Sequence, residues 1–526
     1  MRTFRAFLLA LLSLGFLAHP AGAGEKPALW LYYPTNLLVD SNIDKLEQIW
    51  KRAAAVGYSH VLLADSKFSR LDDLPKEYFK NCERVKRIAA ELKLQIVPAV
   101  FPIGYSNDLL NRDPNLVEGL PVKDALFVVK GGEANVVADP PVSFGKVSFK
   151  DDSVSIEDGV ATVHEGKSVA RMVYHLKVSP FRCYHISVKI KTKDFKAQPE
   201  IKAMAEGDAS MQWQNLGVQP TQDWTRHDVV FNSLDHSEVN IYFGVWNELH
   251  GSLQWKDWMI EEAGLVNLIR REGAPCVVKA DGADKIYVEG TDYEKLVDPH
   301  MGNTPWAGEY QAWHDAPAIH TKLSDGTRLR VSWYHPAIVY DGQVAACISE
   351  PKTMEILADQ AKRMKELWGA PLYMMSHDEF RCCNWDESCQ KRHETPGKML
   401  AENLRQCTKL LRPQQAAVWS DMFDPFHNAV KGPYYLVNGP WTDSWDGLEK
   451  DVLVLNWNYD KRDESLKFFA DRGNPQVIAG YYDGPMSDWK NWLTSAKKVK
   501  GVVGYMYTTW RNDYGKVEEF AEMSGR

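Results

Sequence analysis

The chain of 526 residues has few of the features that mark membrane or nucleic-acid-binding proteins. Beyond residue 23 it has no apolar run of about 20 residues, which is the length that a membrane-spanning helix needs. It has no long run of lysine and arginine, and its formal net charge is −8. The lack of a long apolar run predicts no membrane span. The lack of a basic run predicts no nucleic-acid partner and no binding to anionic lipid.

Two catalytic signatures are also missing. The sequence contains no Gly-x-Ser-x-Gly elbow and no glycine-rich phosphate loop, which argues against the common serine hydrolases and nucleotide-binding enzymes. What is present is a balanced globular composition, with 25% charged, 44% hydrophobic and 11% aromatic residues. A chain of this length and composition predicts an ordered protein with room for two domains.

The first 23 residues have the pattern of an export signal. Arg2 and Arg5 precede an apolar run over residues 6–18, and small residues follow it at positions 21–23. The apolar run is too short to span a bilayer as a helix. We therefore expect cleavage near Ala23 and a secreted or periplasmic protein.

Three of the eight cysteines crowd one segment, at Cys382, Cys383 and Cys389. In an exported chain this clustering predicts a local disulfide. Zinc is the alternative, with His377 and His393 nearby, but the spacing Cys-Cys-x5-Cys lacks a paired Cys-x2-Cys. We expect no metal ion and no cofactor.

The first hundred mature residues alternate buried strands with amphipathic helices. Strands are expected at residues 28–34, 60–66 and 95–101, with helices from Ser41 to Gly57 and over residues 77–92. This alternation is typical of a parallel α/β fold. Later segments repeat it, with a helix at 353–368 and strands at 371–376, 415–420, 452–457, 476–482 and 502–508.

The helical periodicity is lost over residues 125–264, where short alternating segments are separated by Asp, Gly and Pro. This pattern predicts an antiparallel sandwich. The fold class is therefore α/β, a (β/α)8 TIM barrel with an inserted jelly-roll β-sandwich. We expect barrel at residues 24–124, the sandwich at 125–272 and the rest of the barrel at 273–526.

One more strand candidate is present than an eight-stranded barrel holds. Residues 328–335 either belong to the rim of the insertion, so that the strand at 371–376 is the fourth of the barrel, or they are themselves the fourth strand. We favour the first alternative, in which Asp378 and Glu379 follow the fourth strand of the barrel.

Active sites of such barrels lie where the strands end, so polar residues directly after each strand are the candidates. Asp378 and Glu379 follow the strand at 371–376. Two neighbouring carboxylates repel each other, which raises the pKa of one of them and lets it act as a general acid. They are the expected catalytic residues. The expected substrate ligands at this and other strand ends are Asp65, His335, His377, Arg381, Asp421, Trp457, Tyr482, Asp483 and Trp510.

A conventional two-carboxylate mechanism needs a second carboxylate across the sugar from Glu379. Asp421 and Asp483 are the first candidates, with Asp65 behind them. Trp419, Trp457 and Trp510 are candidates for an aromatic cage around a sugar ring.

The His377-Asp378-Glu379 sequence resembles the Asp-Glu motif of family 20 glycoside hydrolases. The resemblance implies that Glu379 is the general acid/base and that Asp378 orients the 2-acetamido group of an N-acetylated sugar. The two glycines that the family has between His and Asp are missing here. The departure leaves the substrate-assisted route and the conventional route both open.

The insertion resembles carbohydrate-binding modules of families 4 and 9, in residues 220–226, 229–233, 242–246 and 255–258. As a whole the chain is similar to bacterial glycosidases of this barrel-plus-sandwich layout. The resemblance implies glycan binding through exposed aromatic residues among Trp213, Trp224, Trp246 and Trp255.

These observations predict an exported glycoside hydrolase, which cleaves O-glycosyl bonds in a carbohydrate substrate, either a glycan or a polysaccharide. Two alternatives stay open. One is a non-catalytic glycan-binding protein, and the other is a different barrel enzyme such as a lyase or esterase.

Overall fold

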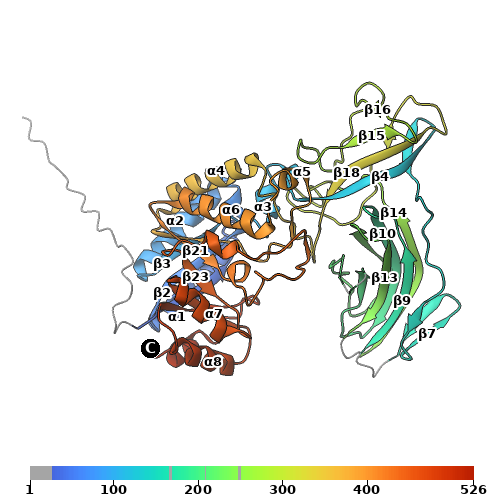
Figure 1. Ribbon diagram of the computed structural model, residues 1–526. Coiled ribbons are helices and arrows are strands. Elements are labelled where there is room, and N and C mark those ends of the chain that lie inside the picture. The colour runs from blue at the N-terminus through green and yellow to red at the C-terminus, as the bar shows by residue number, and fades with distance from the viewer. Residues whose placement is uncertain (1–25, 165–168, 206, 208, 247–249) are drawn as a thin grey trace, which may run out of the picture.

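The computed structural model describes residues 26–526, apart from 165–168, 206, 208 and 247–249. The expected export signal lies outside the described residues. Figure 1 shows two lobes, a barrel ringed by helices on the left and a sandwich of strands on the right. No helix in the described part of the chain is long and apolar enough to cross a membrane.

The first lobe is a closed barrel of eight parallel strands in the order β1-β2-β3-β19-β21-β23-β24-β25. The strand β19 (Leu372–Met375) is the fourth of the barrel, so the first of the two alternatives is confirmed. The other strands are β1 (Ala28–Pro34), β2 (Tyr58–Ala64), β3 (Gln95–Val100), β21 (Gln415–Trp419), β23 (Leu453–Asn456), β24 (Gln476–Tyr482) and β25 (Val502–Thr508).

Alternation along each strand divides the barrel into two apolar layers. In β1, Trp30 and Tyr32 pack inside the barrel, whereas Leu29 and Leu31 pack outward against the helices. The helices of this outer ring are α1 (Asp40–Ala55), α2 (Lys76–Glu91), α4 (Pro351–Trp368), α6 (Pro396–Leu411), α7 (Arg462–Arg472), α8 (Met486–Ala496) and α9 (Val517–Met523).

The second lobe is inserted between β3 and β19. Its sandwich consists of a five-stranded and a four-stranded antiparallel sheet, in the orders β12-β10-β14-β8-β7 and β11-β13-β9-β6. The strands are β6 (Phe149–Lys150), β7 (Val154–Glu157), β8 (Val160–Val163), β9 (Ala170–Lys177), β10 (Cys183–Lys193), β11 (Glu200–Met204), β12 (Gln222–Asn232), β13 (Glu238–Val245) and β14 (Ser252–Glu262). The predicted antiparallel sandwich is therefore present.

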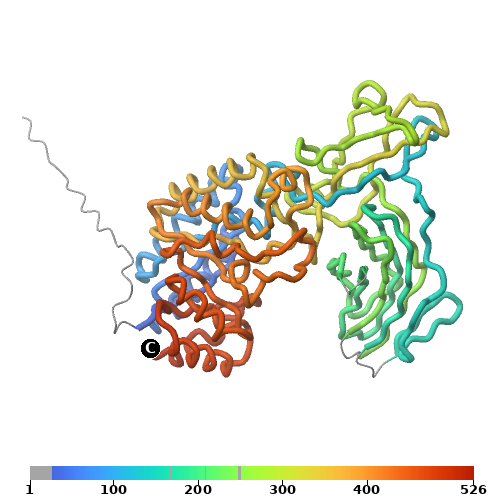
Figure 2. Tube along the Cα trace, in the orientation of Figure 1, coloured from blue at the N-terminus to red at the C-terminus, as the bar shows by residue number. Residues whose placement is uncertain are grey.

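A third sheet joins the lobes and moves the boundary that we expected at residue 273. Its order is β16-β15-β18-β4-β5-β17. The strands β4 (Gly119–Lys130) and β18 (Arg328–Pro336) pair antiparallel, so the chain leaves and re-enters the barrel along neighbouring paths, as Figure 2 shows. The remaining strands are β5 (Glu133–Val136), β15 (Val277–Ala280), β16 (Ile286–Tyr287) and β17 (Ile319–His320). Residues 277–336 therefore belong to the insertion and not to the barrel.

All eight cysteines lie in the described part of the chain, and none of them forms a disulfide. The disulfide expected among Cys382, Cys383 and Cys389 is therefore absent. Cys382 and Cys383 are neighbours in the short strand β20 (Cys382–Cys383), where their side chains enter different apolar clusters. Cys389 lies beyond them in the short helix α5 (Glu387–Gln390).

Candidate active site

The loop after β19 delivers Asp378 and Glu379 to the carboxyl end of the barrel. Ser376 N–H donates to the carbonyl of Val100 at 2.7 Å, which continues the pairing with β3 one residue beyond the strand. Glu379 then has φ of +46°, in the left-handed region that non-glycine residues seldom adopt. The chain therefore turns sharply there, as the placement of two adjacent carboxylates on one rim requires.

Gly104 allows this turn to lie close to the neighbouring loop. A Cβ atom built on Gly104 would overlap the carbonyl oxygen of Asp378 and lie 3.2 Å from its carbonyl carbon. Only glycine fits there without moving one of the two loops.

Asp378 and Glu379 line a cavity of about 690 Å³. Its volume is within the range of about 300–1,000 Å³ that is typical of small-molecule sites. Its wall has seven aromatic residues, most of them at or after strand ends: Tyr32, Phe68, Tyr105, Trp419, Trp457, Tyr482 and Trp510. Carboxylates and flat apolar rings therefore face the same space.

The aromatic wall has a regular arrangement. Trp457 and Tyr482 stack with their ring centroids 5.7 Å apart and their planes within 1° of parallel. Trp510 meets Tyr482 edge-on at 5.7 Å and lies 6.2 Å from Trp419. Tyr482 and Trp510 are 48% and 46% exposed, so large ring surfaces remain open to a ligand.

The Glu379 carboxylate is held at one oxygen. Arg381 forms an ion pair with Glu379 Oε2 at 2.7 Å, and the Tyr105 hydroxyl donates to the same oxygen. Arg381 also donates to the Tyr105 hydroxyl oxygen at 3.1 Å and packs against the rings of Tyr340 and Tyr435. No described residue donates to Glu379 Oε1, so that oxygen is available to a ligand or water.

Asp378 has the opposite electrostatic environment. Burial, together with the charges of Asp421 and Glu379, raises the pKa of the Asp378 carboxyl to about 8. A proton therefore resides on Asp378 at neutral pH, while Glu379 is ion-paired with a guanidinium.

Asp421 supports the motif from behind the pocket wall. It is fully buried, and burial raises its pKa. Its Oδ2 accepts from Glu379 N–H and from Asn428 Nδ2, both at 2.9 Å, and its Oδ1 accepts from Trp457 Nε1 at 3.3 Å. Asp421 therefore positions Glu379 and Trp457 and is not itself part of the cavity wall.

The other two expected carboxylates are used within the protein. Asp65 lines the cavity, but its oxygens accept from Leu37 N–H, Lys67 N–H and the Tyr78 hydroxyl at 2.9–3.1 Å. Asp483 is outside the cavity wall and accepts from the Thr509 hydroxyl and from two backbone N–H groups at positions 510 and 511. Both carboxylates hold turns at strand ends.

The structure does not bring the two expected histidines to the cavity. His335 lies on β18 in the joining sheet, where it is buried and contacts Asn232 at 3.0 Å. His377 is fully buried behind the loop and contacts Asn403 at 3.1 Å. Burial lowers the pKa of each imidazole to about 4, so both are neutral structural residues. For His335 the reason is that its strand pairs with β4 and never enters the barrel.

Tyr105 is a site residue that the sequence did not single out. It follows β3 by five positions, after the apolar residues Phe101, Pro102 and Ile103. Those apolar residues made the end of the strand hard to locate in the sequence, because the first polar side chain after β3 is five positions beyond it. The only signal was a Gly-Tyr pair at a position where a glycine permits close approach of two loops.

Of the four tryptophans expected on the sandwich, Trp255 is core, at 1% exposed. Trp213 packs on Tyr435 of the barrel lobe, with ring centroids 4.7 Å apart. Trp224 and Trp246 are partly exposed, with the ammonium groups of Lys256 and Lys202 over their rings. These two are the candidates for glycan contact.

The chain matches no protein-family model and no curated protein. Several solved structures are similar to the chain over part of its length. A rhamnosidase from Novosphingobium sp. PP1Y is 11% identical over 95% of this chain and 58% of its own, with a TM-score of 0.31. A β-N-acetylhexosaminidase from Bacteroides fragilis is 15% identical over 35% of this chain and 41% of its own, with a TM-score of 0.25.

The insertion has its own match. A family 4 carbohydrate-binding module is 18% identical over 27% of this chain and 88% of its own, with a TM-score of 0.17. At these identities and scores, none of the three structures identifies a family for this chain.

Proposed function

We propose that the protein is a glycoside hydrolase that binds a sugar in the cavity at the end of the barrel. The observation that supports this most strongly is the meeting of open aromatic rings with Asp378 and Glu379 in one space of about 690 Å³. Apolar ring faces suit the C–H faces of a sugar. A protonated and an ionised carboxyl are the two groups that glycosidic cleavage requires.

In the proposed reaction Asp378 is the general acid. As the bond between the anomeric carbon and the glycosidic oxygen breaks, the leaving oxygen takes the proton of Asp378. Glu379, through its free Oε1, takes a proton from a water molecule whose oxygen bonds to the anomeric carbon. Exchange with solvent then returns the proton to Asp378 and removes the one on Glu379.

This assignment reverses the roles that the resemblance to family 20 implies. There the glutamate carries the proton, but here Arg381 and Tyr105 both donate to Glu379, while burial and neighbouring charge favour the proton on Asp378. A protonated Asp378 is also poorly suited to accept a hydrogen bond from an acetamido N–H. We therefore propose a two-carboxylate route in which the adjacent Asp378 and Glu379 are themselves the pair and an N-acetylated sugar is not required.

The partner that this proposal names is a carbohydrate. We propose further that the protein acts outside the cytoplasm, because its first 23 residues have the pattern of an export signal.

The test is a screen of aryl glycosides and natural polysaccharides with the wild type, Asp378→Asn and Glu379→Gln. A general acid contributes about 10²–10⁴-fold to rate. Asp378→Asn should therefore lose that factor on substrates with poor leaving groups and lose less on activated aryl glycosides. Asp446→Asn, which removes an exposed carboxylate outside the cavity wall, is the matched control and should keep wild-type rates.

Two outcomes would contradict the proposal. If sugars bind to the wild type but no substrate in the screen is cleaved, the protein is a glycan-binding protein without catalysis. If Glu379→Gln shows the leaving-group dependence and Asp378→Asn does not, the acid is Glu379, as the family resemblance implies.

A further inference from the structure

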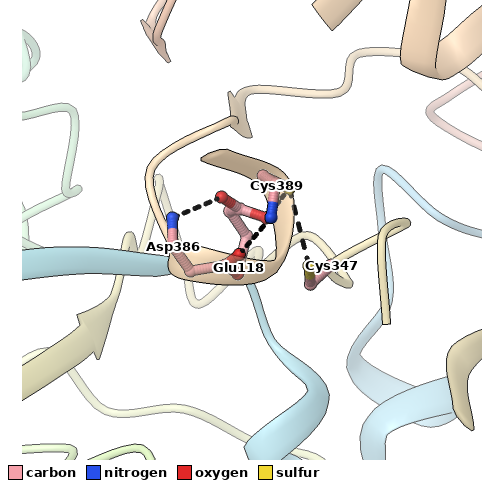
Figure 3. A group of neighbouring side chains, drawn as sticks. All are labelled: Glu118, Cys347, Asp386 and Cys389. Carbon is pink, nitrogen blue, oxygen red and sulfur yellow. Dashed lines mark hydrogen bonds between the residues drawn. The ribbon is translucent and has the colours of Figure 1, made fainter. Parts of the chain in front are cut away.

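Four buried side chains that are distant in sequence converge behind the catalytic loop. Possible ligand atoms of Glu118, Cys347, Asp386 and Cys389 all lie within 4.8 Å of one another. Figure 3 shows the four side chains together. Each residue is at most 1% exposed. The cluster is separate from the cavity, since none of the four lines it.

The four residues come from three segments that meet at the junction of the two lobes. Glu118 directly precedes β4, where the chain leaves the barrel. Cys347 lies between β18 and α4, where the chain returns. Asp386 is the N-cap residue of α5 and Cys389 lies within this helix, in the segment that follows Asp378 and Glu379.

Two interatomic distances in the cluster match those around a tetrahedral metal ion. Cys347 Sγ and Cys389 Sγ are 3.6 Å apart, and Cys389 Sγ lies 3.4 Å from Glu118 Oε2. Around a zinc ion with Zn–S near 2.3 Å and Zn–O near 2.0 Å, two sulfurs are about 3.8 Å apart and a sulfur and an oxygen about 3.5 Å. A disulfide needs about 2.05 Å between its sulfurs, so these thiols are not bonded to each other.

The charges of the cluster also call for a cation. The described partners of the Glu118 carboxylate are uncharged donors, namely the N–H groups of Trp385 and Asp386 and the Cys389 thiol. The nearby guanidinium of Arg271 is engaged by Asp386 and by Glu350, at 2.5 and 2.6 Å. A carboxylate buried without a cation is costly, and a bound metal ion is one of the ways in which proteins offset that cost.

We propose that Glu118, Cys347, Asp386 and Cys389 bind a divalent transition-metal ion of the zinc type. Thiolate ligands favour such an ion over calcium or magnesium. Four protein ligands fill a tetrahedral site, so the ion is structural and takes no part in the reaction. The hydrogen bonds from Cys389 N–H and Arg271 to Asp386 are outer-shell contacts of the kind that orient a metal-bound carboxylate.

The bound ion connects three segments: the one where the chain leaves the barrel, the one where it returns, and the one that follows the catalytic pair. These ligands differ from the zinc site considered from the sequence, which combined Cys382, Cys383 and Cys389 with His377 or His393. His377 contacts Asn403, and His393 is outside the cluster. The ligand pattern was hidden because only Asp386 and Cys389 are near each other in sequence.

The test is the metal content of the full-length protein, purified without chelator and dialysed against metal-free buffer. Elemental analysis by inductively coupled plasma mass spectrometry should find one equivalent of zinc per chain. Replacement by Co²⁺ should give thiolate-to-cobalt charge-transfer absorption, and a strong chelator should lower the melting temperature. None of these readouts depends on catalytic activity.

Variants locate the ion. Glu118→Gln keeps the side-chain volume and should weaken zinc binding at least tenfold, and Cys347→Ser with Cys389→Ser should abolish the cobalt absorption. Cys276→Ser, which removes a cysteine outside the cluster, should change neither result. The proposal is overturned if the wild type holds no transition metal and takes up none from added Zn²⁺. It is equally overturned if the mass of the unreduced protein shows a Cys347–Cys389 disulfide, or if the double variant keeps its full equivalent of metal.

Discussion

Gly104→Ala tests how closely two loops of the site depend on each other. The added methyl group would overlap the carbonyl oxygen of Asp378 and lie 3.3 Å from the carbonyl carbon of Glu379. These neighbours are backbone atoms, so no side-chain rotation can relieve the contact. Either the loop at 101–106, which carries Tyr105, or the loop at 376–384 must move.

The size of the effect follows from the overlap. Restoring van der Waals contact requires a shift of roughly 1 Å, and misplacing catalytic groups by that distance costs about 10²-fold in rate. Overpacking of a close contact of this kind costs about 1–3 kcal/mol in the free energy of unfolding. We therefore expect kcat/KM to fall about a hundredfold, with a modest fall in melting temperature.

The assay is kcat/KM on the substrate identified by the screen, together with thermal unfolding of the same preparation. Gly432→Ala is the matched control, because a Cβ there meets no atom within 4 Å and the glycine has no positive φ. If Gly104→Ala keeps the activity and stability of Gly432→Ala, then the close approach of the two loops does not hold the catalytic pair, and our account of the loop is wrong.

Three further predictions concern the neighbours of the catalytic pair and the sandwich. Asp421→Asn removes a negative charge that raises the pKa of Asp378, so the alkaline limb of the pH–rate profile should move to lower pH; an unmoved limb would show that the two groups are not coupled. Tyr105→Phe removes one donor to Glu379 and should lower kcat about tenfold with little change in KM, whereas an increase in KM alone would make Tyr105 a substrate ligand. Trp246→Ala should weaken binding of the full-length protein to insoluble polysaccharide in a pull-down assay without changing kcat on a small glycoside; unchanged binding would make the sandwich a spacer at this surface.

Much of the barrel could be predicted from the sequence, because its strands and helices carry strong local periodicities. The polar and aromatic residues that directly follow apolar strands were found in the same way, and the structure places Trp457, Tyr482 and Trp510 together in the cavity wall. A strand end is a local feature of the sequence, and a closed parallel barrel brings all such ends to one rim.

What the sequence could not reveal depends on long-range pairing. The alternation of residues 328–336 suits a barrel strand or an antiparallel strand equally well, and only pairing with β4 takes His335 away from the site. The surroundings of the Glu379 carboxylate depend in the same way on Tyr105, which is distant in sequence, and on Arg381, which pairs with Glu379 across a turn at positive φ.

The pH dependence of kcat/KM tests the central claim most directly, because this profile reports the pKa values of the free enzyme. The pKa of Asp378 is raised to about 8, so its proton is present below that pH and is lost as the pH rises through it. On an activated aryl glycoside, the wild type should show an alkaline limb near pH 8, and Asp378→Asn should retain a lower rate without that limb. The same alkaline limb in Asp378→Asn as in the wild type would contradict the assignment of Asp378 as the acid.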